Sequence, residues 1–486
     1  MTIEQYLKKH AGETPNKMAA ADIDRSLTYA ELWSKVKCIA YIMKVEYKIK
    51  KHDYVLIRSS QTLEHIIVYF GIHLLGAVAV PLETDVPMET MLEMQKETGA
   101  SLILSHKEEA IESSVSIFDL KKVYEKMDAV NEPDSWEDFP LDSDYADVML
   151  TTGTTGKSKG VILSHENLFA TAENIMYGLD IKDSDCMLVV GPLNHANPIR
   201  KVYTAIIKGS SVVVIQGMSS MKNFFGALDK YPINCMCIPP SGIRVLLQIT
   251  GDKLSEYRDR IEYMENSTAP MPENLRQKLG ELLPDARLYN SYGSSEAGAI
   301  VIYDYNHYKK EAGCAGKPSH HANLFFVDDE GNKIESSKEN PGLLVCEGKV
   351  NMQGYLGDEE LTKQALRNGL IYTNDIGYFA EDGFVYLLGR KDDVINIGGY
   401  KIAPTEVEEI IELFDGVEEC MLVEELDSVI GSFLKLSVVV NESFVMDELK
   451  KYMKEKLESY KVPKVIDIVE DIPKTFNGKK DRKKKG

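Results

Sequence analysis

Residues 150–160, LTTGTTGKSKG, have the side chains of a loop that binds phosphate groups. Five hydroxyl side chains and two lysines lie among its glycines. Glycines let backbone N–H groups converge on phosphate oxygens, while hydroxyls and lysines add donors and positive charge. The segment ends as a P-loop does, in Gly156-Lys157-Ser158, but Thr151 stands where that motif has its first glycine. We therefore expect a phosphate site of another kind, with a plain polar connection between a strand and a helix as the alternative.

Four later segments also carry side chains suited to chemistry. They supply an aromatic ring, hydroxyls and carboxylates, a pair of glycines, and a lysine that follows a glycine near the end of the chain. Alone, each segment is weak evidence for a functional site, because turns, solvated corners and frayed tails have similar compositions. The segments are NSYGSSEAG (290–298), IYTNDIGYF (371–379), GRKDDVINIGGYK (389–401) and PKTFNGKKDRK (473–483).

The elements that position these segments alternate between strands and helices from about Tyr54 to Tyr289. Alternation of this kind predicts parallel sheets covered by helices, with ligands beyond the carboxyl ends of the strands. Residues 150–160 would lie at such an end. The expected strands are 54–59, 77–82, 101–105, 147–151, 187–191, 211–216, 233–238 and 286–290, and the expected helices are 62–75, 88–98, 165–176, 221–230, 241–249 and 271–283.

From about Leu324 the strands become shorter and are separated by Gly, Asp and Asn, which predicts a more antiparallel subdomain. After Gly389 a charged turn, a strand, a Gly-Gly bend and a helix follow, and then strand, strand, helix and strand. We therefore expect an N-terminal domain over residues 1–389, with a subdomain at about 324–389. A C-terminal α+β domain of ordinary size would cover residues 390–486.

Composition excludes several classes of protein. The 486 residues are 44% hydrophobic and 27% charged, as in ordinary folded proteins of two or three units. A net charge of −20 disfavours nucleic acid and anionic lipid as partners. Residues 65–82 are the most apolar run but contain His65 and His73, so we expect a buried helix and a strand, not a membrane span.

The seven cysteines predict a reduced, cytoplasmic setting. They are odd in number and scattered, without a C-x-x-C pair, and the N-terminus lacks the apolar segment of a secretion signal. Cys235 and Cys237 alternate as core residues of a strand would, so we do not expect them to bind metal. The others are Cys38, Cys186, Cys314, Cys346 and Cys420.

Together, and in this order, the five segments resemble the adenylate-forming superfamily of acyl-CoA synthetases, nonribosomal adenylation domains and luciferases, the AMP-dependent synthetases and ligases. The resemblance covers nearly the whole chain. TTGTTGKSKG is similar to the family's phosphate loop, YGSSE to its Tyr-Gly-x-Thr-Glu element, TND to Thr-Gly-Asp, GRKDD…GGYK to its hinge, and NGK to its terminal catalytic lysine. It implies an α/β fold: a large domain of parallel helix-covered sheets with a small β-barrel-like subdomain, and a small mobile α+β C-terminal domain.

The resemblance implies a reaction in two steps. A carboxylate attacks the α-phosphate of ATP to give an acyl adenylate and pyrophosphate, and a thiol then takes the acyl group. The thiol belongs to coenzyme A or to the phosphopantetheine of a separate carrier protein. An amine or oxygen acceptor is the alternative, and a nucleotide-binding regulator without catalysis is a more distant one. Residues 150–160 would hold the departing pyrophosphate.

Family resemblance and side-chain chemistry together assign roles at the nucleotide. Tyr292 offers a flat face to adenine, Asp375 accepts from the ribose hydroxyls, and Glu296 suits Mg²⁺, which prefers oxygen ligands. Lys479 would stabilise charge at the α-phosphate and the bridging oxygen. Lys479, His195 and Glu296 are the predicted catalytic residues. The predicted ATP and AMP site comprises Thr151, Thr152, Gly153, Thr154, Thr155, Gly156, Lys157, Thr268, Ala269, Asn290, Ser291, Tyr292, Gly293, Ser294, Ser295, Asp375, Arg390 and Lys479.

In this family the C-terminal domain rotates between the two steps. By resemblance, Asp392 is the pivot, and Gly398, Gly399 and Lys401 line the channel for the pantetheine arm. Lys401 stands where arginine is common, so it keeps the charge but loses the planar fork. Asn374 replaces the usual glycine before Asp375, and Ser295 replaces a threonine.

The acid pocket is predicted at His195, Asn197, Arg200, Pro240 and Gly298. His195 matches the family's Pro-Leu-x-His gate, with a satisfied loop histidine as the alternative. Ala196 stands where amino-acid-activating domains carry aspartate, so a small carboxylic acid other than an α-amino acid is expected. Arg200 would pair with a second group on the acid, or else be solvated on a helix face. The sequence leaves the oligomeric state open.

Overall fold

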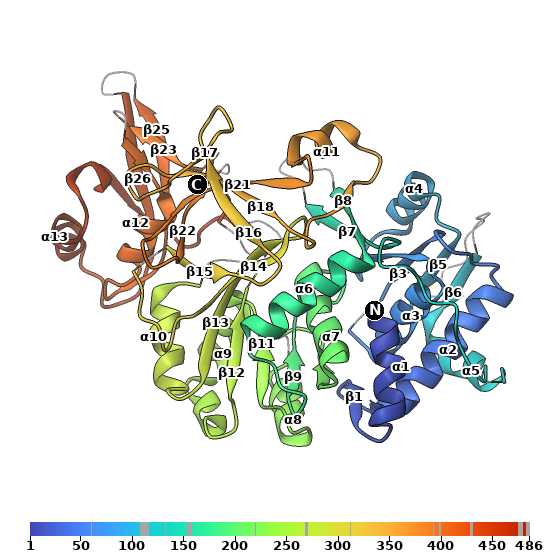
Figure 1. The fold of residues 1–486 in the computed structure, drawn as a ribbon. Coiled ribbons are helices and arrows are strands. Elements are labelled where there is room, and N and C mark those ends of the chain that lie inside the picture. Colours follow the sequence, from blue (N-terminus) through green and yellow to red (C-terminus); the bar gives the residue numbers. More distant parts are fainter. Residues whose placement is uncertain are drawn as a thin grey trace.

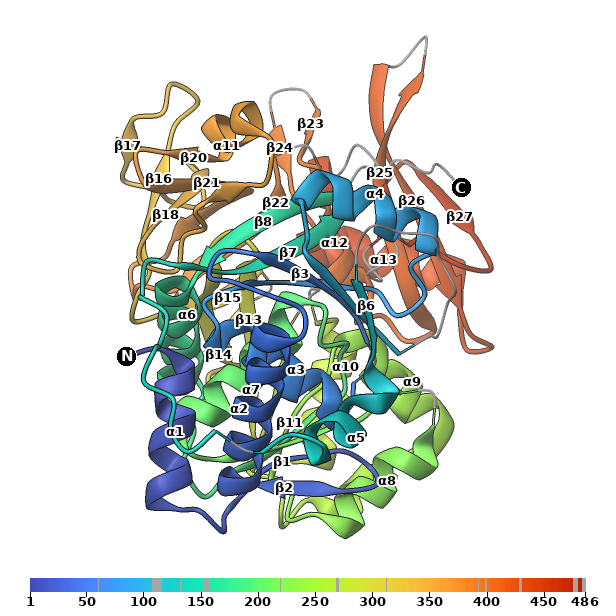
Figure 2. The same ribbon diagram turned by 90° about the vertical axis from the view of Figure 1, so that its right-hand side faces the viewer.

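The computed structural model describes residues 1–59, 61–106, 116–131, 133–152, 158–218, 220–267, 271–311, 313–391, 393–397, 400–427, 431–474 and 480–482. Two large sheets form most of it (Figures 1 and 2). The first has the order β19-β8-β7-β4-β3-β5-β6. Its strands are β3 (Tyr54–Arg58), β4 (Val78–Leu82), β5 (Leu102–Ser105), β6 (Ser116–Asp119), β7 (Tyr145–Thr152), β8 (Ser158–Ser164) and β19 (Gly354–Tyr355).

Strands β3 to β7 of this sheet are parallel, whereas β8 pairs antiparallel with both β7 and β19. Helix α3 (Leu63–Leu74) is buried along its whole length and leads into β4, as the apolar run predicts. Helix α4 (Met88–Thr98) buries Met91 against the other face of the sheet. The alternation of apolar runs thus predicted the parallel part of this sheet.

The second sheet begins with β2 (Ser26–Thr28) at one edge and is parallel from β1 (Met18–Ala21) to β13 (Arg287–Ser294). Between them lie β10 (Ser211–Val214), β9 (Cys186–Val189), β11 (Cys235–Cys237) and β12 (Tyr263–Asn266). Antiparallel strands continue it: β14 (Gly298–Asp304), β15 (Cys314–Pro318), β22 (Val385–Arg390), β21 (Leu370–Phe379), β18 (Gly342–Glu347), β16 (Asn323–Val327) and β17 (Lys333–Ile334), with β20 (Leu366–Arg367) beside β21.

Helices cover both faces of the second sheet. One core joins residues of both sheets with α1 (Ile3–Glu13), α2 (Tyr29–Val45), α3, α6 (His165–Gly178) and α7 (Ala196–Lys208). A second core lies under α8 (Met221–Lys230), α9 (Pro240–Thr250) and α10 (Glu273–Leu282). The remaining helices are α5 (Val123–Asp128), α11 (Glu359–Ala365), η1 (Leu120–Lys122), η2 (Lys253–Tyr257) and η3 (Ser459–Lys461).

The C-terminal part has a hydrophobic core of its own. It contains β23 (Ile395–Ile397), β24 (Tyr400–Ile402), α12 (Pro404–Ile411), β25 (Val417–Asp427), β26 (Gly431–Val440), α13 (Met446–Lys456) and β27 (Val465–Ile468). Figure 1 shows it in orange to red beside β22 and α10. Its order of elements is the predicted one. No helix in the described ranges has both the length and the apolarity that a membrane crossing needs.

The predicted α/β fold class is confirmed, but two local expectations were wrong. The alternative of a connection from a strand to a helix at residues 150–160 is wrong, because residues 158–160 already belong to β8, which continues to Ser164 before α6 begins. The apolar residues Val161 and Leu163 are buried in this strand, and Gly160 lies where a Cβ would be 2.8 Å from Val148. Antiparallel pairing also begins at β13 and β14, well before Leu324. Helix α7 was not among the expected helices, although Arg200 was considered on a helix face, and most of its residues are buried.

Candidate active site

The centre of the candidate nucleotide site is a hydrogen bond between two strands. The Tyr292 hydroxyl on β13 donates to Asp375 Oδ2 on β21 at 2.6 Å. The ring packs against the main core, and burial together with the Asp375 charge raises the pKa of Tyr292 well above its ordinary value. The structure thus joins the side chain predicted to face adenine with the one predicted to face ribose.

Strand register places Arg390 beside this pair. Asp375 on β21 lies directly opposite Arg390 on β22, whose side chain is exposed. Asn374, in place of the family's glycine, fits β21 as an ordinary strand residue, and its carbonyl accepts from Lys391 N–H at 2.7 Å. Asn290 is buried on the same strand as Tyr292, and the Ser291 hydroxyl is buried without a hydrogen-bond partner among the described residues.

Arg200 on α7 binds the turn that follows β13. Its guanidinium donates to the carbonyls of Ser294 and Ser295 at 3.0 and 3.2 Å, and the side chain is only 6% exposed. Burial lowers the pKa of Arg200 to about 10. Gly293 is required at this turn because a Cβ there would lie 1.9 Å from the carbonyl oxygen of Gly298. The expected solvated arginine is therefore buried, and its charge supports the turn.

Glu296 links this turn to the first sheet. Its Oε1 accepts from the Tyr355 hydroxyl at 2.8 Å, and Tyr355 lies on β19, which pairs with β8. Its carboxylate is partly exposed at the turn between β13 and β14, beside the hairpin of β7 and β8. An oxygen donor of this kind fits Mg²⁺, which usually binds through one or two carboxylates and substrate phosphates.

The predicted phosphate loop joins β7 to β8. Thr151 and Thr152 end β7, and the Thr151 hydroxyl lies 3.5 Å from the carbonyl oxygen of Lys159 on β8. The loop itself, Gly153, Thr154, Thr155, Gly156 and Lys157, lies outside the described residues, as do Thr268 and Ala269. Strand β8 carries one end of this loop and pairs with β19, whose Tyr355 binds Glu296.

His195 stands immediately before α7 and contacts a residue that sequence analysis did not select. Its Nε2 lies 3.1 Å from Glu83 Oε1, which follows β4. The hydrogen bond from His195 lowers the pKa of the Glu83 carboxyl. Both side chains are about one-third exposed, so His195 remains accessible at the predicted gate.

Asn197 belongs to a buried polar chain. Its amide donates to Ser267 Oγ at 2.5 Å, and its carbonyl accepts from Lys201 Nζ at 3.0 Å. Lys201 also binds Glu265 at 2.8 Å, and this ion pair is fully buried. Lys201, Glu265 and Ser267 were not singled out from the sequence, because no local pattern pairs α7 with β12.

The other two predicted acid-pocket residues are buried. Pro240 begins α9, where its missing N–H costs no helix bond. Gly298 has a φ of 70°, and a Cβ there would lie 2.5 Å from Thr171 Oγ1. Gly298 therefore allows the close approach of the turn to α6, and nothing in its contacts separates that role from a pocket role.

The end of the chain is tied to helix α12. Lys480 Nζ lies 2.9 Å from both Glu408 and Glu412, and Arg482 binds Glu408 at 2.7 Å. Burial alone would lower the pKa of Lys480, but these carboxylates outweigh it and raise the pKa. The basic tail thus has acidic partners in its own domain. Lys479, Asp392, Gly398 and Gly399 lie outside the described residues, and only the backbone of Lys401, on β24, is described.

The described side chains collect around a sheet edge suited to a nucleotide, and comparison with known proteins agrees. The AMP-binding enzyme family matches residues 7–356, and the AMP-binding enzyme C-terminal domain matches residues 406–479. The chain belongs to the AMP-binding enzyme family. The resemblance predicted from the motifs is confirmed.

Several relatives are similar over nearly their full length. The 2-succinylbenzoate–CoA ligase of Bacillus mycoides (strain KBAB4) is 27% identical over 480 residues, covering 98% of this chain and 97% of the relative. An o-succinylbenzoate CoA synthetase structure from Bacillus subtilis, in complex with its acyl-adenylate intermediate, is 26% identical, with a TM-score of 0.83 and coverage of 99% and 97%. An anthranilate CoA ligase in complex with anthranoyl-AMP shares the fold at 19% identity, with a TM-score of 0.87 and coverage of 100% and 96%.

Proposed function

We propose that this chain joins a small carboxylic acid to the thiol of coenzyme A in two steps driven by ATP. A carboxylate oxygen attacks the α-phosphorus of ATP, the bond to the bridging oxygen breaks, and pyrophosphate leaves. The thiol then attacks the carbonyl carbon of the acyl adenylate, and AMP leaves. The hydrogen bond between Tyr292 and Asp375 carries the proposal, because it joins the adenine and ribose candidates in a chain of this family.

The nucleotide would bind along β13 and β21. Tyr292 and Asn290 would contact adenine, and Asp375 and Arg390 the ribose. Glu296 would hold Mg²⁺, which neutralises charge on the phosphates when bound. The loop from Thr151 to Lys157 would hold the pyrophosphate, and Lys479 would stabilise the charge that builds as it leaves.

The acid would lie at the beginning of α7, near His195 and Asn197. We propose an aryl carboxylic acid, because the Bacillus relatives are ligases of 2-succinylbenzoate. A second polar group on the acid would meet the neutral pair of Asn197 and Ser267, which bind each other, while the charges of Arg200 and Lys201 are held by carbonyl and carboxylate acceptors of the protein. Ala196 disfavours α-amino acids, because it offers no carboxylate to an ammonium group.

Coenzyme A is proposed as the acceptor because these relatives are CoA ligases, with a phosphopantetheinyl carrier as the other outcome. We propose that residues 390–486 swing on Asp392 relative to residues 1–389, which exchanges Lys479 for the segment of Gly398, Gly399 and Lys401. All seven cysteines are buried thiols, in keeping with a reducing compartment such as the cytoplasm.

The test is acid-dependent exchange of labelled pyrophosphate into ATP. The panel contains 2-succinylbenzoate, benzoate, anthranilate, malonate, octanoate and phenylalanine, with Lys479→Ala beside wild type. We expect exchange with an aryl acid, its collapse in the variant, and thioester formation when coenzyme A is added. Exchange with phenylalanine alone would refute the substrate class, and bound ATP without exchange or product on any acid would refute the function.

A further inference from the structure

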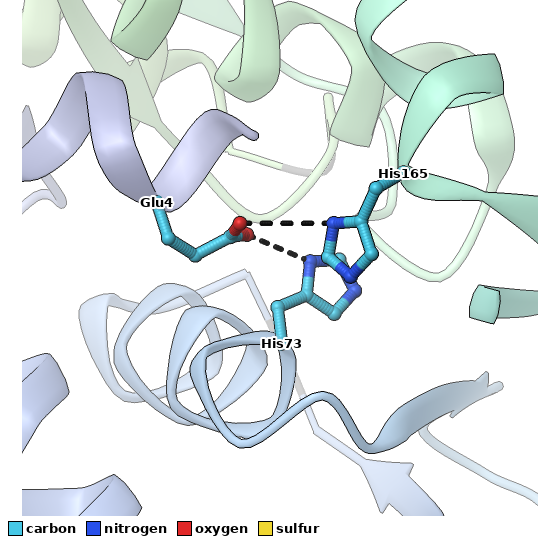
Figure 3. Close-up of side chains that lie close together, drawn as sticks. All are labelled: Glu4, His73 and His165. Carbon is cyan, nitrogen blue, oxygen red and sulfur yellow. Dashed lines mark hydrogen bonds and ion pairs between the residues drawn. The ribbon is translucent and has the colours of Figure 1, made fainter. Parts of the chain in front are cut away.

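A second group of ionisable side chains lies between the helices, among residues that the proposed reaction does not use. Figure 3 shows Glu4 of α1, His73 of α3 and His165 of α6 directed toward one another. All three are buried, none more than 1% exposed. Glu4 Oε1 lies 3.2 Å from His73 Nδ1, and Glu4 Oε2 lies 3.6 Å from His165 Nδ1.

The hydrogen bonds of this group are incomplete. Among the described residues, neither ring nitrogen of His165 has a hydrogen-bond partner, and Glu4 Oε2 has none. Buried polar atoms in folded proteins are nearly always satisfied, so each exception requires an explanation. Here the unsatisfied atoms belong to two side chains that face each other, and both are of types that bind metal ions.

We propose that Glu4, His73 and His165 bind a divalent metal ion of the zinc class. One ligand atom from each of the three side chains lies within 4.8 Å of the others. Zinc bonds to histidine nitrogen and carboxylate oxygen are about 2.0–2.2 Å, which sets neighbouring ligand atoms of a tetrahedron roughly 3.3–3.5 Å apart. Glu4 Oε1 to His73 Nδ1, at 3.2 Å, and Glu4 Oε2 to His165 Nδ1, at 3.6 Å, are each close to this length, so each histidine faces its own carboxylate oxygen at ligand spacing. Imidazole ligands favour zinc over magnesium or calcium.

The neighbours of His73 are those of a metal-binding histidine. While Nδ1 faces Glu4, Nε2 lies 3.0 Å from Asp147 Oδ1 on β7. A carboxylate on the second ring nitrogen fixes the tautomer and orientation of a histidine ligand. Asp147 is itself held by the hydroxyls of Tyr69 and Tyr203, at 2.5 and 2.8 Å.

Charge also supports a divalent ion. Glu4 and Asp147 are two fully buried carboxylates on either side of His73, and a protonated His73 would supply one positive charge, enough to balance only one of them. Zinc would replace that proton and balance both. Arg200 also acts on Asp147 electrostatically, but its guanidinium donates to the carbonyls of Ser294 and Ser295.

The ion would have a structural role close to the phosphate loop. It would tie α1 and α3 to the first residue of α6, which follows β8, and through His73 and Asp147 to β7. Strands β7 and β8 are the two strands that precede and follow residues 153–157. The site is separate from Glu296, where Mg²⁺ is proposed for catalysis.

The test is metal content after refolding, because a fully buried ion enters as the chain folds. Wild type is refolded from guanidinium chloride with zinc sulfate and desalted, and its zinc is measured by mass spectrometry. We expect one zinc per chain, lost in His165→Asn and Glu4→Gln. His65→Asn is the matched control, because His65 is also a fully buried histidine without a described hydrogen-bond partner, but lies outside the group. It should retain the zinc.

Cobalt gives a second readout that does not depend on activity. Refolding with cobalt(II) should give the visible absorption of a low-coordinate nitrogen and oxygen site in wild type and in His65→Asn. Wild type without zinc or cobalt bands would overturn the proposal, as would equal zinc in His165→Asn. If His165→Asn does not fold, Glu4→Gln and the wild-type cobalt spectrum decide. Pyrophosphate exchange, assayed separately with Mg²⁺, tests the proposed ligase.

Discussion

The nucleotide side and the α7 side of the candidate site use polar side chains differently. On the nucleotide side, Tyr292 and Asp375 bind each other across two strands, while Arg390 beside them is exposed. On the α7 side, Arg200 and Lys201 are buried and already bind protein acceptors. The first region keeps a charged side chain exposed where a nucleotide is proposed, whereas the second binds both of its cationic side chains to the protein.

This difference separates two kinds of prediction from sequence. The residues of a motif such as YGSSE are adjacent in the chain, so they stay together, here at the end of β13 and in the turn that follows it. A charged residue on a helix carries no such information, because its partner comes from a distant strand. Substitutions on the nucleotide side should therefore change reaction kinetics, and those in α7 should mainly change stability.

The largest effect is expected for Lys479, which the sequence motif assigns to the adenylation step. Lys479→Ala should slow acyl-adenylate formation by about 10²–10³-fold, the scale of one preorganised electrostatic contact. Single-turnover adenylation measures it, with Lys464→Ala, an exposed lysine of the same domain, as control. A rate within tenfold of wild type would contradict the assignment.

The next effect is expected in α7. Arg200→Lys keeps the charge but loses the fork that reaches both carbonyls, so the free energy of unfolding should fall by about 2–3 kcal/mol. Urea unfolding gives the value, and the exposed Arg367→Lys is the control, with a change under about 0.5 kcal/mol. If stability were unchanged and KM for the acid rose strongly, Arg200 would instead contact the acid, as the sequence analysis predicted.

A smaller effect is expected for Tyr292→Phe, which removes the hydroxyl bound to Asp375. Losing one hydrogen bond costs about 1 kcal/mol, so KM for ATP should rise roughly fivefold while KM for the acid stays the same. Initial rates at varied ATP measure it, with the exposed Tyr308→Phe as control. Equal changes in both KM values would contradict the assignment of Tyr292 to the nucleotide side alone.

The last prediction concerns the pH dependence of stability, through a carboxylate that joins the two parts of the chain. Glu409 on α12 accepts from the Gly313 N–H at 3.0 Å, and burial raises its pKa to about 7 although Arg276 and this N–H oppose the shift. Glu412 and Glu273 add to the rise. The folded state therefore binds this proton more tightly than the unfolded state, whose ordinary value is 4.5.

Glu409 should consequently contribute most to stability below about pH 4.5, and that contribution should fall as the pH rises toward about 7. The melting temperature of wild type should fall relative to that of Glu409→Gln across this window, because glutamine does not titrate. Above about pH 7 the difference between the two should stay level. Differential scanning calorimetry from pH 4.5 to 8 measures it. A difference that does not change with pH would show that Glu409 keeps its ordinary titration.

Much of the fold could be predicted because its signals are local. Apolar runs such as 77–82 and 211–216 became the parallel strands β4 and β10, and the order of elements after Gly389 was as expected. Strand β8 was missed because its apolar residues follow a loop rich in hydroxyls, and only pairing with β7 and β19 shows it as a strand. Arg200 was interpreted as solvated or ligand-bound for the same reason, since its acceptors lie 94 and 95 residues away.

Family membership, the order of the motifs and the residue types predicted for the nucleotide site follow from the chain alone, because they depend on short segments whose spacing is fixed along the chain. The tertiary structure decided which side chains meet. Tyr292 reaches Asp375, Tyr355 reaches Glu296, and Glu4 faces His73 and His165 only when helices and strands far apart in the chain pack together. Hydrogen bonds and metal ligands act over a few ångströms, so their partners are chosen by packing and not by distance along the sequence.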